Sequence, residues 1–326
     1  MNFLVTGGCG FIGSNLVRRL IEIFPDSEVH NIDKLTYAAN NSLDQLADNK
    51  NYFFYHEDIC NIDLLSDLVL TIKPSIIFHL AAESHVDNSI SSPYDFIQTN
   101  IIGTFNLLEA AYKLYKQTNP INFKLIHIST DEVFGDLSMD DKPFTEFSRY
   151  QPSSPYSSSK ASSDHLVKAW NRTYNLPTIV TNCSNNYGPF QDNEKFIPTI
   201  INSLKSNLKI PVYGDGLQIR DWLYVDDHAD ALIEVAKNGI VGSSYVIGGE
   251  NELSNIELVS KIINIFHNIK VDKRSILDFV DFVSDRPGHD KRYAIDSSKI
   301  IEELNWMPKV NVDEGLISTI DWYKNK

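Results

Sequence analysis

Short apolar runs alternate with segments of helical periodicity through the first 184 residues. Six of these runs are expected as strands, around residues 3–5, 29–32, 52–55, 75–78, 123–128 and 178–181. Helical patterns separate them at residues 11–24, 63–71, about 94–116 and after 155. Strands that alternate with helices and lack hairpin signals are typical of βαβ units. The pattern predicts an α/β fold, a doubly wound parallel sheet of the Rossmann type.

The regular alternation of strands and helices becomes irregular beyond Pro189. We expect about 185–220 and 248–326 to form a smaller C-terminal lobe that binds the substrate. Residues of about 221–247 are expected to return to the sheet. The larger domain would then comprise 1–184 together with about 221–247.

Composition narrows the class of partner. The chain has 326 residues and a formal charge of −14, from 29 basic and 43 acidic residues. Nucleic acid binding needs a basic surface, which this balance does not favour. Three cysteines without CxxC spacing suit a reducing compartment, and no apolar run approaches the ~18 residues of a membrane span. Because the N-terminus enters a strand at once, no signal peptide is expected either. We therefore expect a cytoplasmic protein that binds neither nucleic acid nor membrane.

A glycine-rich turn follows the first predicted strand. The sequence TGGCGFIG at residues 6–13 fits both GxxGxxG and GxGxxG and precedes the first helix. Glycines in this position let a pyrophosphate approach the backbone, and the helix N-terminus attracts the anion. Asp33 ends the second strand, where an acidic residue hydrogen-bonds the ribose of a dinucleotide. A carboxylate repels a 2′-phosphate, so NAD is favoured over NADP, although the cation of Lys34 could tolerate a phosphate.

Asp58 follows the third strand and has two interpretations. It could lie beside the adenine, or it could cap the helix that follows. The full set of candidate cofactor-binding residues is Gly7, Gly10, Phe11, Ile12, Gly13, Asp33, Lys34, Asp58, Ile59, Ala81, Thr99, Tyr156 and Lys160.

A polar cluster, Ser-Thr-Asp-Glu at residues 129–132, stands where the fifth predicted strand ends. Ligands of open α/β sheets bind outside the carboxyl ends of the strands. Adjacent strand residues point to opposite faces, so Asp131 and Glu132 can converge only if the strand has ended before them. Capping or a solvated loop is the alternative for such a pair.

Tyr156 and Lys160 follow with i, i+4 spacing, which places both on one face of a helix. An unperturbed tyrosine has a pKa near 10 and is a poor base at neutral pH. We expect the positive charges of Lys160 and of an oxidised nicotinamide to lower this pKa by about 3 units.

Eight motifs in order over nearly the whole chain carry a resemblance to a known family. They are TGGCGFIG, HLAAESHVD, STDEVFG, YSSSK, SNNYGP, IPVYGDG, RDWLYV and DRPGHDKRY. The chain resembles the extended short-chain dehydrogenase/reductase family and, within it, the dTDP-glucose 4,6-dehydratases. The resemblance implies an NAD-binding domain, a nucleotide-sugar-binding domain and a homodimer, with contacts through the 94–116 and 156–174 helices.

The resemblance also implies a lyase reaction: oxidation at C4 of the glucose, elimination of water across C5–C6, and return of the hydride to C6. Tyr156 would remove the proton of the C4 hydroxyl, with Lys160 as its partner, while Thr130 hydrogen-bonds that hydroxyl. Glu132 would act as base at C5, and Asp131 would protonate the departing C6 hydroxyl. Two neighbouring carboxyls raise one another's pKa, which allows one to be ionised while the other holds a proton.

Further positions match the family's substrate contacts, and arginine suits a diphosphate. The candidate substrate-binding residues are Ser84, Asn185, Lys195, Pro211, Tyr213, Arg220, Asn255, Arg286 and His289. No spacing typical of metal ligands appears, so no metal is expected.

Three alternatives stay open: a nucleotide-sugar 4-epimerase, a 4,6-dehydratase acting on UDP-glucose, and an NAD-sensing regulator without catalytic activity. An epimerase needs neither a base for C5 nor an acid for C6, so residues 131 and 132 discriminate. The motifs leave the preferred nucleotide base unresolved, although they favour dTDP.

Overall fold

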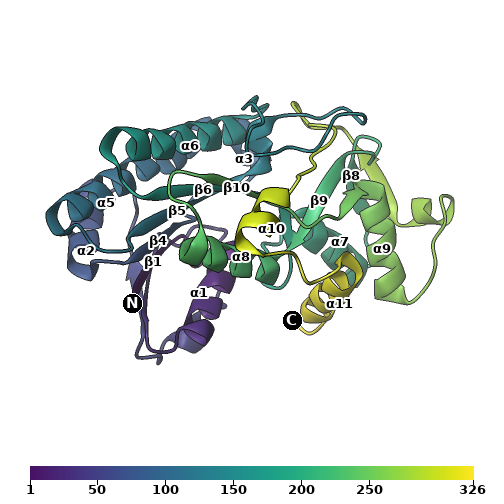
Figure 1. Ribbon diagram of the computed structural model, residues 1–326. Coiled ribbons are helices and arrows are strands. Elements are labelled where there is room, and N and C mark those ends of the chain that lie inside the picture. The colour runs from purple at the N-terminus through teal and green to yellow at the C-terminus, as the bar shows by residue number, and fades with distance from the viewer.

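Seven parallel strands form the central sheet of the protein (Figure 1). They are β1 (Asn2–Thr6), β2 (Glu28–Asp33), β3 (Tyr52–His56), β4 (Ile76–His79), β5 (Lys124–Thr130), β6 (Thr178–Cys183) and β10 (Ser244–Ile247). Their order across the sheet is β10-β6-β5-β4-β1-β2-β3, and every neighbouring pair is parallel. The computed structural model describes all 326 residues. The expected Rossmann-type α/β fold is confirmed.

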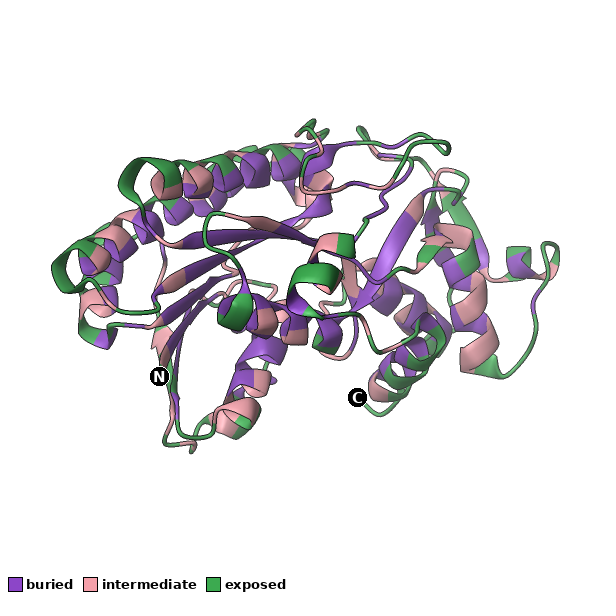
Figure 2. Cartoon of the chain, in the orientation of Figure 1, coloured by how far each residue is buried: buried purple, intermediate pink, exposed green.

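Helices cover both faces of this sheet, which explains why its central strands are apolar along their length. One face packs against α2 (Ile62–Ile72), α5 (Thr104–Thr118) and α6 (Pro155–Tyr174). The other packs against α1 (Phe11–Ile23), α8 (Val225–Asn238) and α10 (Ser298–Leu304). The buried residues follow the sheet and the inner helix faces (Figure 2).

A smaller lobe lies beyond the carboxyl edge of the sheet (Figure 1). It contains a three-stranded sheet, β7 (Asn185–Tyr187), β9 (Ile219–Tyr224) and β11 (Glu252–Ser254), and a parallel pair, β8 (Ile210–Tyr213) and β12 (Val280–Val283). Helices α7 (Phe196–Lys205), α9 (Asn255–His267) and α11 (Val312–Lys324) enclose its apolar core. No helix of the chain is long and apolar enough to cross a membrane.

Segment 221–247 is shared between the two parts. Its first residues belong to β9 and pair with β7 and β11 of the smaller lobe. Helix α8 packs against α1, and β10 joins the edge of the large sheet beside β6. The division into two domains stays a prediction.

Two local elements differ from the expected ones. The region expected as one long helix over 94–116 consists of α4 (Pro93–Phe96), a π-helical segment (Ile97–Gly103) and α5, and a further short helix, α3 (Val86–Ser91), precedes it. Strand β5 continues two residues beyond the expected end, through Thr130, and a 3₁₀ turn (Asp131–Phe134) follows at once. Asp131 therefore begins a new element, which meets the condition for the two carboxyls to converge.

The order in which the chain adds strands to the sheet reverses between β1 and β4, and such a switch point is where α/β sheets bind ligands. The chain after β1 approaches the chain after β4 closely. A Cβ added to Gly7 would lie 2.6 Å from the backbone nitrogen of Ala81. The fold thus brings the glycine turn to the middle of the carboxyl edge.

Candidate active site

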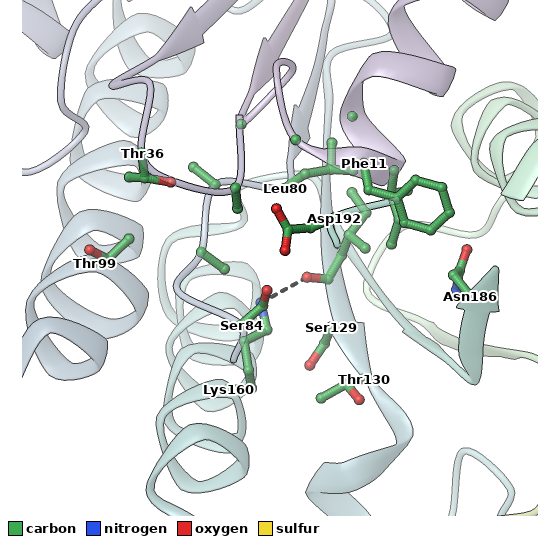
Figure 3. A pocket seen from close by; sticks show the side chains of 18 of the residues that line it. Phe11, Thr36, Leu80, Ser84, Thr99, Ser129, Thr130, Lys160, Asn186 and Asp192 are labelled. Atoms are coloured by element: carbon green, nitrogen blue, oxygen red, sulfur yellow. Dashed lines mark hydrogen bonds between the residues drawn. The ribbon is translucent and has the colours of Figure 1, made fainter. Parts of the chain in front are cut away.

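A single cavity runs along the carboxyl edge of the sheet and gathers most of the residues that the sequence singled out (Figure 3). It is lined by the turn between β1 and α1, by residues that follow β2 to β6, and by the start of α6. The predicted residues among its lining are Gly7, Gly10, Phe11, Ile12, Gly13, Asp33, Lys34, Asp58, Ile59, Ala81, Ser84, Thr99, Thr130, Asp131, Glu132, Tyr156, Lys160, Asn185 and Lys195.

The glycine turn has the shape that a dinucleotide pyrophosphate requires. Gly7 has a φ of +74°, which side chains rarely adopt, and a Cβ at Gly13 would lie 2.2 Å from the carbonyl oxygen of Gly7. Gly10 faces the open side, where an added Cβ would meet no atom nearer than 3.3 Å. Helix α1 begins at Phe11 without a side-chain cap. The N–H groups of its first turn are therefore left for an anion.

Asp33 lies at the end of β2 and borders the same cavity. Its Oδ2 accepts a hydrogen bond from the backbone N–H of Cys9 at 2.9 Å, so the carboxylate is tied to the glycine turn. Lys34 points toward other acids: its Nζ lies 3.4 Å from Glu83 Oε1 and 4.0 Å from Asp58 Oδ2. Because these carboxylates partly neutralise Lys34, the cation offers little to a 2′-phosphate.

Asp58 does not cap the following helix. The residue that caps α2 is Asn61, whose side chain accepts from the N–H of Leu64. Asp58 Oδ1 instead accepts from the N–H of Cys60 at 2.8 Å, within its own turn. Of its two interpretations, the place beside the cofactor agrees with its position in the cavity lining.

Thr130 connects the strand to the carboxyl pair. Its hydroxyl accepts from the N–H of Glu132 at 3.2 Å and donates to Asp131 Oδ1 at 3.2 Å. The side chain thus caps the 3₁₀ turn that carries both acids. Asp131 is 1% exposed, and its Oδ2 has no hydrogen-bond partner.

The two carboxyls have different electrostatic surroundings. Burial, then the charges of Glu132 and Asp221, raise the pKa of Asp131 well above its ordinary value. Burial also raises the pKa of Glu132, but the positive charges of Arg286, Arg220 and Lys195 act against that increase. Asp131 is therefore the member that keeps a proton more readily, and Glu132 the member that ionises more readily.

Tyr156 and Lys160 are both buried near the start of α6, at 8% and 4% exposure. In Figure 3, Lys160 lies beside Ser129 and Thr130 at the end of β5. Its Nζ donates to the carbonyl oxygen of Ile128 at 2.8 Å.

The protein's own groups act on the pKa of Tyr156 in the direction opposite to the expected lowering. Burial and the nearby charge of Glu132 raise this pKa well above its ordinary value, so the chain by itself does not activate the phenol. The expected lowering relies on a bound nicotinamide as well as on Lys160, and their charges must outweigh this effect of burial.

The remaining candidates lie in the smaller lobe and do not line this cavity: Pro211, Tyr213, Arg220, Asn255, Arg286 and His289. The Tyr213 hydroxyl donates to Asp87 Oδ2 at 3.2 Å, and Arg286 Nη1 lies 3.8 Å from Asp87 Oδ1. Asp87 belongs to α3 of the larger part, so these contacts join the two lobes beside the site.

Arg220 is held more rigidly than its neighbours. Its Nη2 donates to the carbonyl oxygen of Asp290 at 2.9 Å, and its guanidinium lies over the ring of Tyr293, 4.2 Å from the centroid. Asn255 donates to Gln218 Oε1 at 3.3 Å, and His289 Nδ1 lies 2.6 Å from Asp285 Oδ1.

Several residues that line the cavity are not among those predicted from the strand ends. They lie at or after the ends of β2, β4 and β6: Thr36, Leu80, Cys183, Ser184, Asn186, Gln191 and Asp192. Those after β6 could have been found, because the carboxyl ends of parallel strands meet at one edge. No group of three or more His, Cys, Asp or Glu side chains is arranged to hold a metal ion.

Known proteins resemble the chain over its whole length. A family model described as GDP-mannose 4,6 dehydratase matches residues 4–319. A dTDP-glucose 4,6-dehydratase of Neisseria meningitidis serogroup B is 54% identical, over 98% of this chain and 92% of that protein. One from Escherichia coli is 52% identical, over 100% and 94%.

Solved structures are similar as well. The dTDP-glucose 4,6-dehydratase of Streptomyces venezuelae with NAD and TYD bound has a TM-score of 0.91 at 40% identity, covering 100% of this chain and 97% of that one. The UDP-glucose 4-epimerase of Thermotoga maritima has a TM-score of 0.88 at 29% identity, covering 100% and 99%.

Proposed function

We propose that this chain, which belongs to the GDP-mannose 4,6-dehydratase family within the extended short-chain dehydrogenases/reductases, is an NAD-dependent hydro-lyase. It converts dTDP-glucose to dTDP-4-keto-6-deoxyglucose. The observation that carries this function is the pair Asp131 and Glu132, two adjacent carboxyls with opposed electrostatic surroundings beside Tyr156.

The residues around the glycine turn fit NAD. The pyrophosphate matches the open side of Gly10 and the uncapped first turn of α1. The ribose matches the carboxylate of Asp33. Held by these residues, NAD would supply the hydride transfer between C4 and C6, and its oxidised ring would contribute positive charge. That charge, together with Lys160, offsets the high pKa of Tyr156.

The side chains of the site divide the proton transfers among them. Tyr156 takes the proton of the C4 hydroxyl, and Thr130 hydrogen-bonds that hydroxyl at the end of β5. A ketone at C4 acidifies the C5 proton, which Glu132 removes. Asp131 then gives its proton to the departing C6 hydroxyl, so water leaves across C5–C6.

Cations that surround Glu132 also suit the diphosphate of the substrate. The charges of Arg220, Arg286 and Lys195 all lower the pKa of Glu132, which supports a role for these three residues beside the reacting centre. Arginine forms paired hydrogen bonds with phosphate oxygens. Ser84, Asn185, Pro211, Tyr213, Asn255 and His289 complete the proposed substrate contacts.

A panel of NDP-glucoses tests this function. Purified protein incubated with dTDP-glucose should form a 4-keto-6-deoxy sugar, detected as a ketone absorbance under alkali, without added NADH. UDP-, CDP- and GDP-glucose, assayed beside it, should react more slowly. A hexose product that keeps its C6 hydroxyl would identify an epimerase instead and overturn the proposal.

We also infer that the protein is a homodimer of the cytoplasm. Apolar side chains stand exposed on the helices expected at the interface, among them Tyr94 at 70%, Ile97 at 42% and Ile102 at 39%. A row of exposed apolar residues on neighbouring helices is typical of a protein–protein contact. The three cysteines are free thiols, which supports a reducing compartment.

A further inference from the structure

A buried carboxylate lies on helix α6, on its side toward β5 and β6, and is not part of the cavity lining. The side chain of Asp164 is wholly buried. Its Oδ2 accepts from the Tyr150 hydroxyl at 2.8 Å and from Asn182 Nδ2 at 3.0 Å, and its Oδ1 lies 3.1 Å from His127 Nε2. A carboxyl so far from water is costly to ionise without partners. Three polar neighbours, from β5, β6 and the loop that precedes α6, surround this one.

Asp164 stands one helical turn after Lys160 on α6. Residues four apart share a helix face, and side chains lean toward the N-terminus of the helix, so Asp164 leans toward Lys160. Lys160 is 4% exposed, and its single hydrogen bond goes to a neutral acceptor, the carbonyl oxygen of Ile128. A buried ammonium of this kind needs a nearby anion to stay charged.

Asp164 is also tied to the reacting end of β5. Asn182 donates to Asp164 and, from the same amide nitrogen, to the carbonyl oxygen of Thr130 at 3.1 Å. These hydrogen bonds therefore connect the buried carboxylate of Asp164 to Thr130, the residue that hydrogen-bonds the C4 hydroxyl in the proposed function.

We propose that Asp164 is a positioning residue that keeps Lys160 positively charged, and that Lys160 thereby supports the ionisation of Tyr156. The proposal rests on the function assigned above, since the ionised phenol is the base for the C4 hydroxyl. Asp164 itself touches neither substrate nor cofactor.

Asp164 is the anion that stabilises the charge of Lys160, because the other titratable groups around this pair are neutral or positively charged. Burial lowers the pKa of His127 to about 4, and burial raises the pKa of the Cys183 thiol to about 12, so both are neutral. Burial lowers the pKa of His79 as well, and Lys168 donates to the Tyr150 hydroxyl at 2.9 Å. Burial would raise the pKa of Asp164, but hydrogen bonding from His127 and the charge of Lys160 bring it below the ordinary value. Asp131 and Glu132 face Tyr156 rather than this network.

The pH profile of Asp164→Asn tests the proposal. Asparagine keeps the shape and can still accept from Tyr150, but it removes the charge. Without that charge Lys160 loses its proton more easily, the pKa of Tyr156 rises, and the acid limb of kcat/KM moves to higher pH. We expect a move of at least about one unit, which is about a tenfold loss below the midpoint and a recovery above it.

Tyr150→Phe is the matched control, because it removes one hydrogen bond to Asp164 and leaves the carboxylate in place. Its acid limb should stay where it is in the wild type. If Asp164→Asn lowers kcat/KM equally at every pH, Asp164 is only a structural residue and the proposal is wrong.

Unfolding in urea gives a second test, which does not depend on the single Asn variant being active. Lys160→Met leaves the buried Asp164 carboxylate without its cation, so adding Asp164→Asn to it should raise the free energy of unfolding. In the Lys160 background the same change should lower it. Additive effects of the two substitutions would show that the side chains are not coupled. If the wild type fails to turn over dTDP-glucose, the proposed function falls, whereas this stability coupling is still measurable.

Discussion

Replacing Glu132 with glutamine separates the oxidation from the elimination. Glutamine keeps the size of the side chain but cannot accept the C5 proton. None of the hydrogen bonds in the structure engages the Glu132 carboxylate, so its oxygens are available as a base. The C4 oxidation relies on Tyr156 and should persist.

Loss of a positioned general base costs about 10²- to 10⁴-fold in rate, which is about 2.7 to 5.5 kcal/mol in the barrier. We expect kcat for the 4-keto-6-deoxy product to fall by that factor in Glu132→Gln. The charge of Glu132 is the largest electrostatic contribution that raises the pKa of Tyr156, after burial. Removing it lowers that pKa, so the acid limb of the oxidation should move to lower pH.

Stopped-flow absorbance of reduced nicotinamide, followed by product analysis, measures both steps. Glu132→Gln should accumulate the reduced cofactor on mixing with dTDP-glucose, while the wild type shows little. Asp140→Asn, a change at an exposed acid outside the cavity, serves as the control and should behave like the wild type. Unchanged turnover in Glu132→Gln, or no reduced cofactor, would refute the assignment of the base.

Three further changes test other parts of the account. Asp131→Asn should abolish most of the elimination, and it should also stabilise the fold. Because the pKa of Asp131 is raised in the folded protein, ionisation of this carboxyl opposes folding as pH rises, so the gain in the free energy of unfolding in urea should grow from pH 5 to pH 8. A gain that does not depend on pH would contradict this. Gly13→Ala places a Cβ 2.2 Å from the Gly7 carbonyl oxygen, so the purified variant should retain less than about a tenth of the wild-type NAD, by absorbance of released cofactor; full retention would show that the turn does not hold it. Ile102→Glu should convert the dimer to a monomer in light scattering, whereas Ile317→Glu, on an equally exposed position of α11, should not.

The sequence predicts the strands of the large sheet well because the central strands are buried on both faces. Apolar runs therefore mark them without ambiguity, as at β1 and β4. The hydrophobic pattern does not reveal a strand where the buried residues are polar. Ser129 and Thr130 extend β5 by pairing with Asn182 and Cys183 of β6, and no hydrophobic signal marks them.

The break in the predicted 94–116 helix has a tertiary cause. The Asn100 side chain donates to the carbonyl oxygen of Glu83 and to the hydroxyl of Ser159, and Thr104 donates back to the Asn100 carbonyl. Gly103 packs against Ile59 so closely that a Cβ would lie 2.5 Å from it. Such contacts between distant residues favour a π-helical segment, and periodicity along one stretch of chain does not reveal them.

The sequence predicted which residues form the candidate site better than it predicted the pKa shifts of those residues. Residue types and spacing pointed to Tyr156, Lys160 and the two acids. The sign of the pKa shift at Tyr156 could not be read from spacing, because it depends on burial and on the approach of Glu132. The difference between the pKa shifts of Asp131 and Glu132 likewise depends on the charges of Arg220, Arg286 and Lys195, which belong to the smaller lobe.

The fate of the hydrogen at C4 tests the central claim most directly. dTDP-glucose labelled with deuterium at C4 should give a 4-keto-6-deoxy product that carries the label at C6, seen by NMR and mass spectrometry. The account predicts this transfer because the hydride removed by oxidation returns to C6 after water has left. A label that stays at C4, in a sugar that keeps its C6 hydroxyl, would contradict the assignment.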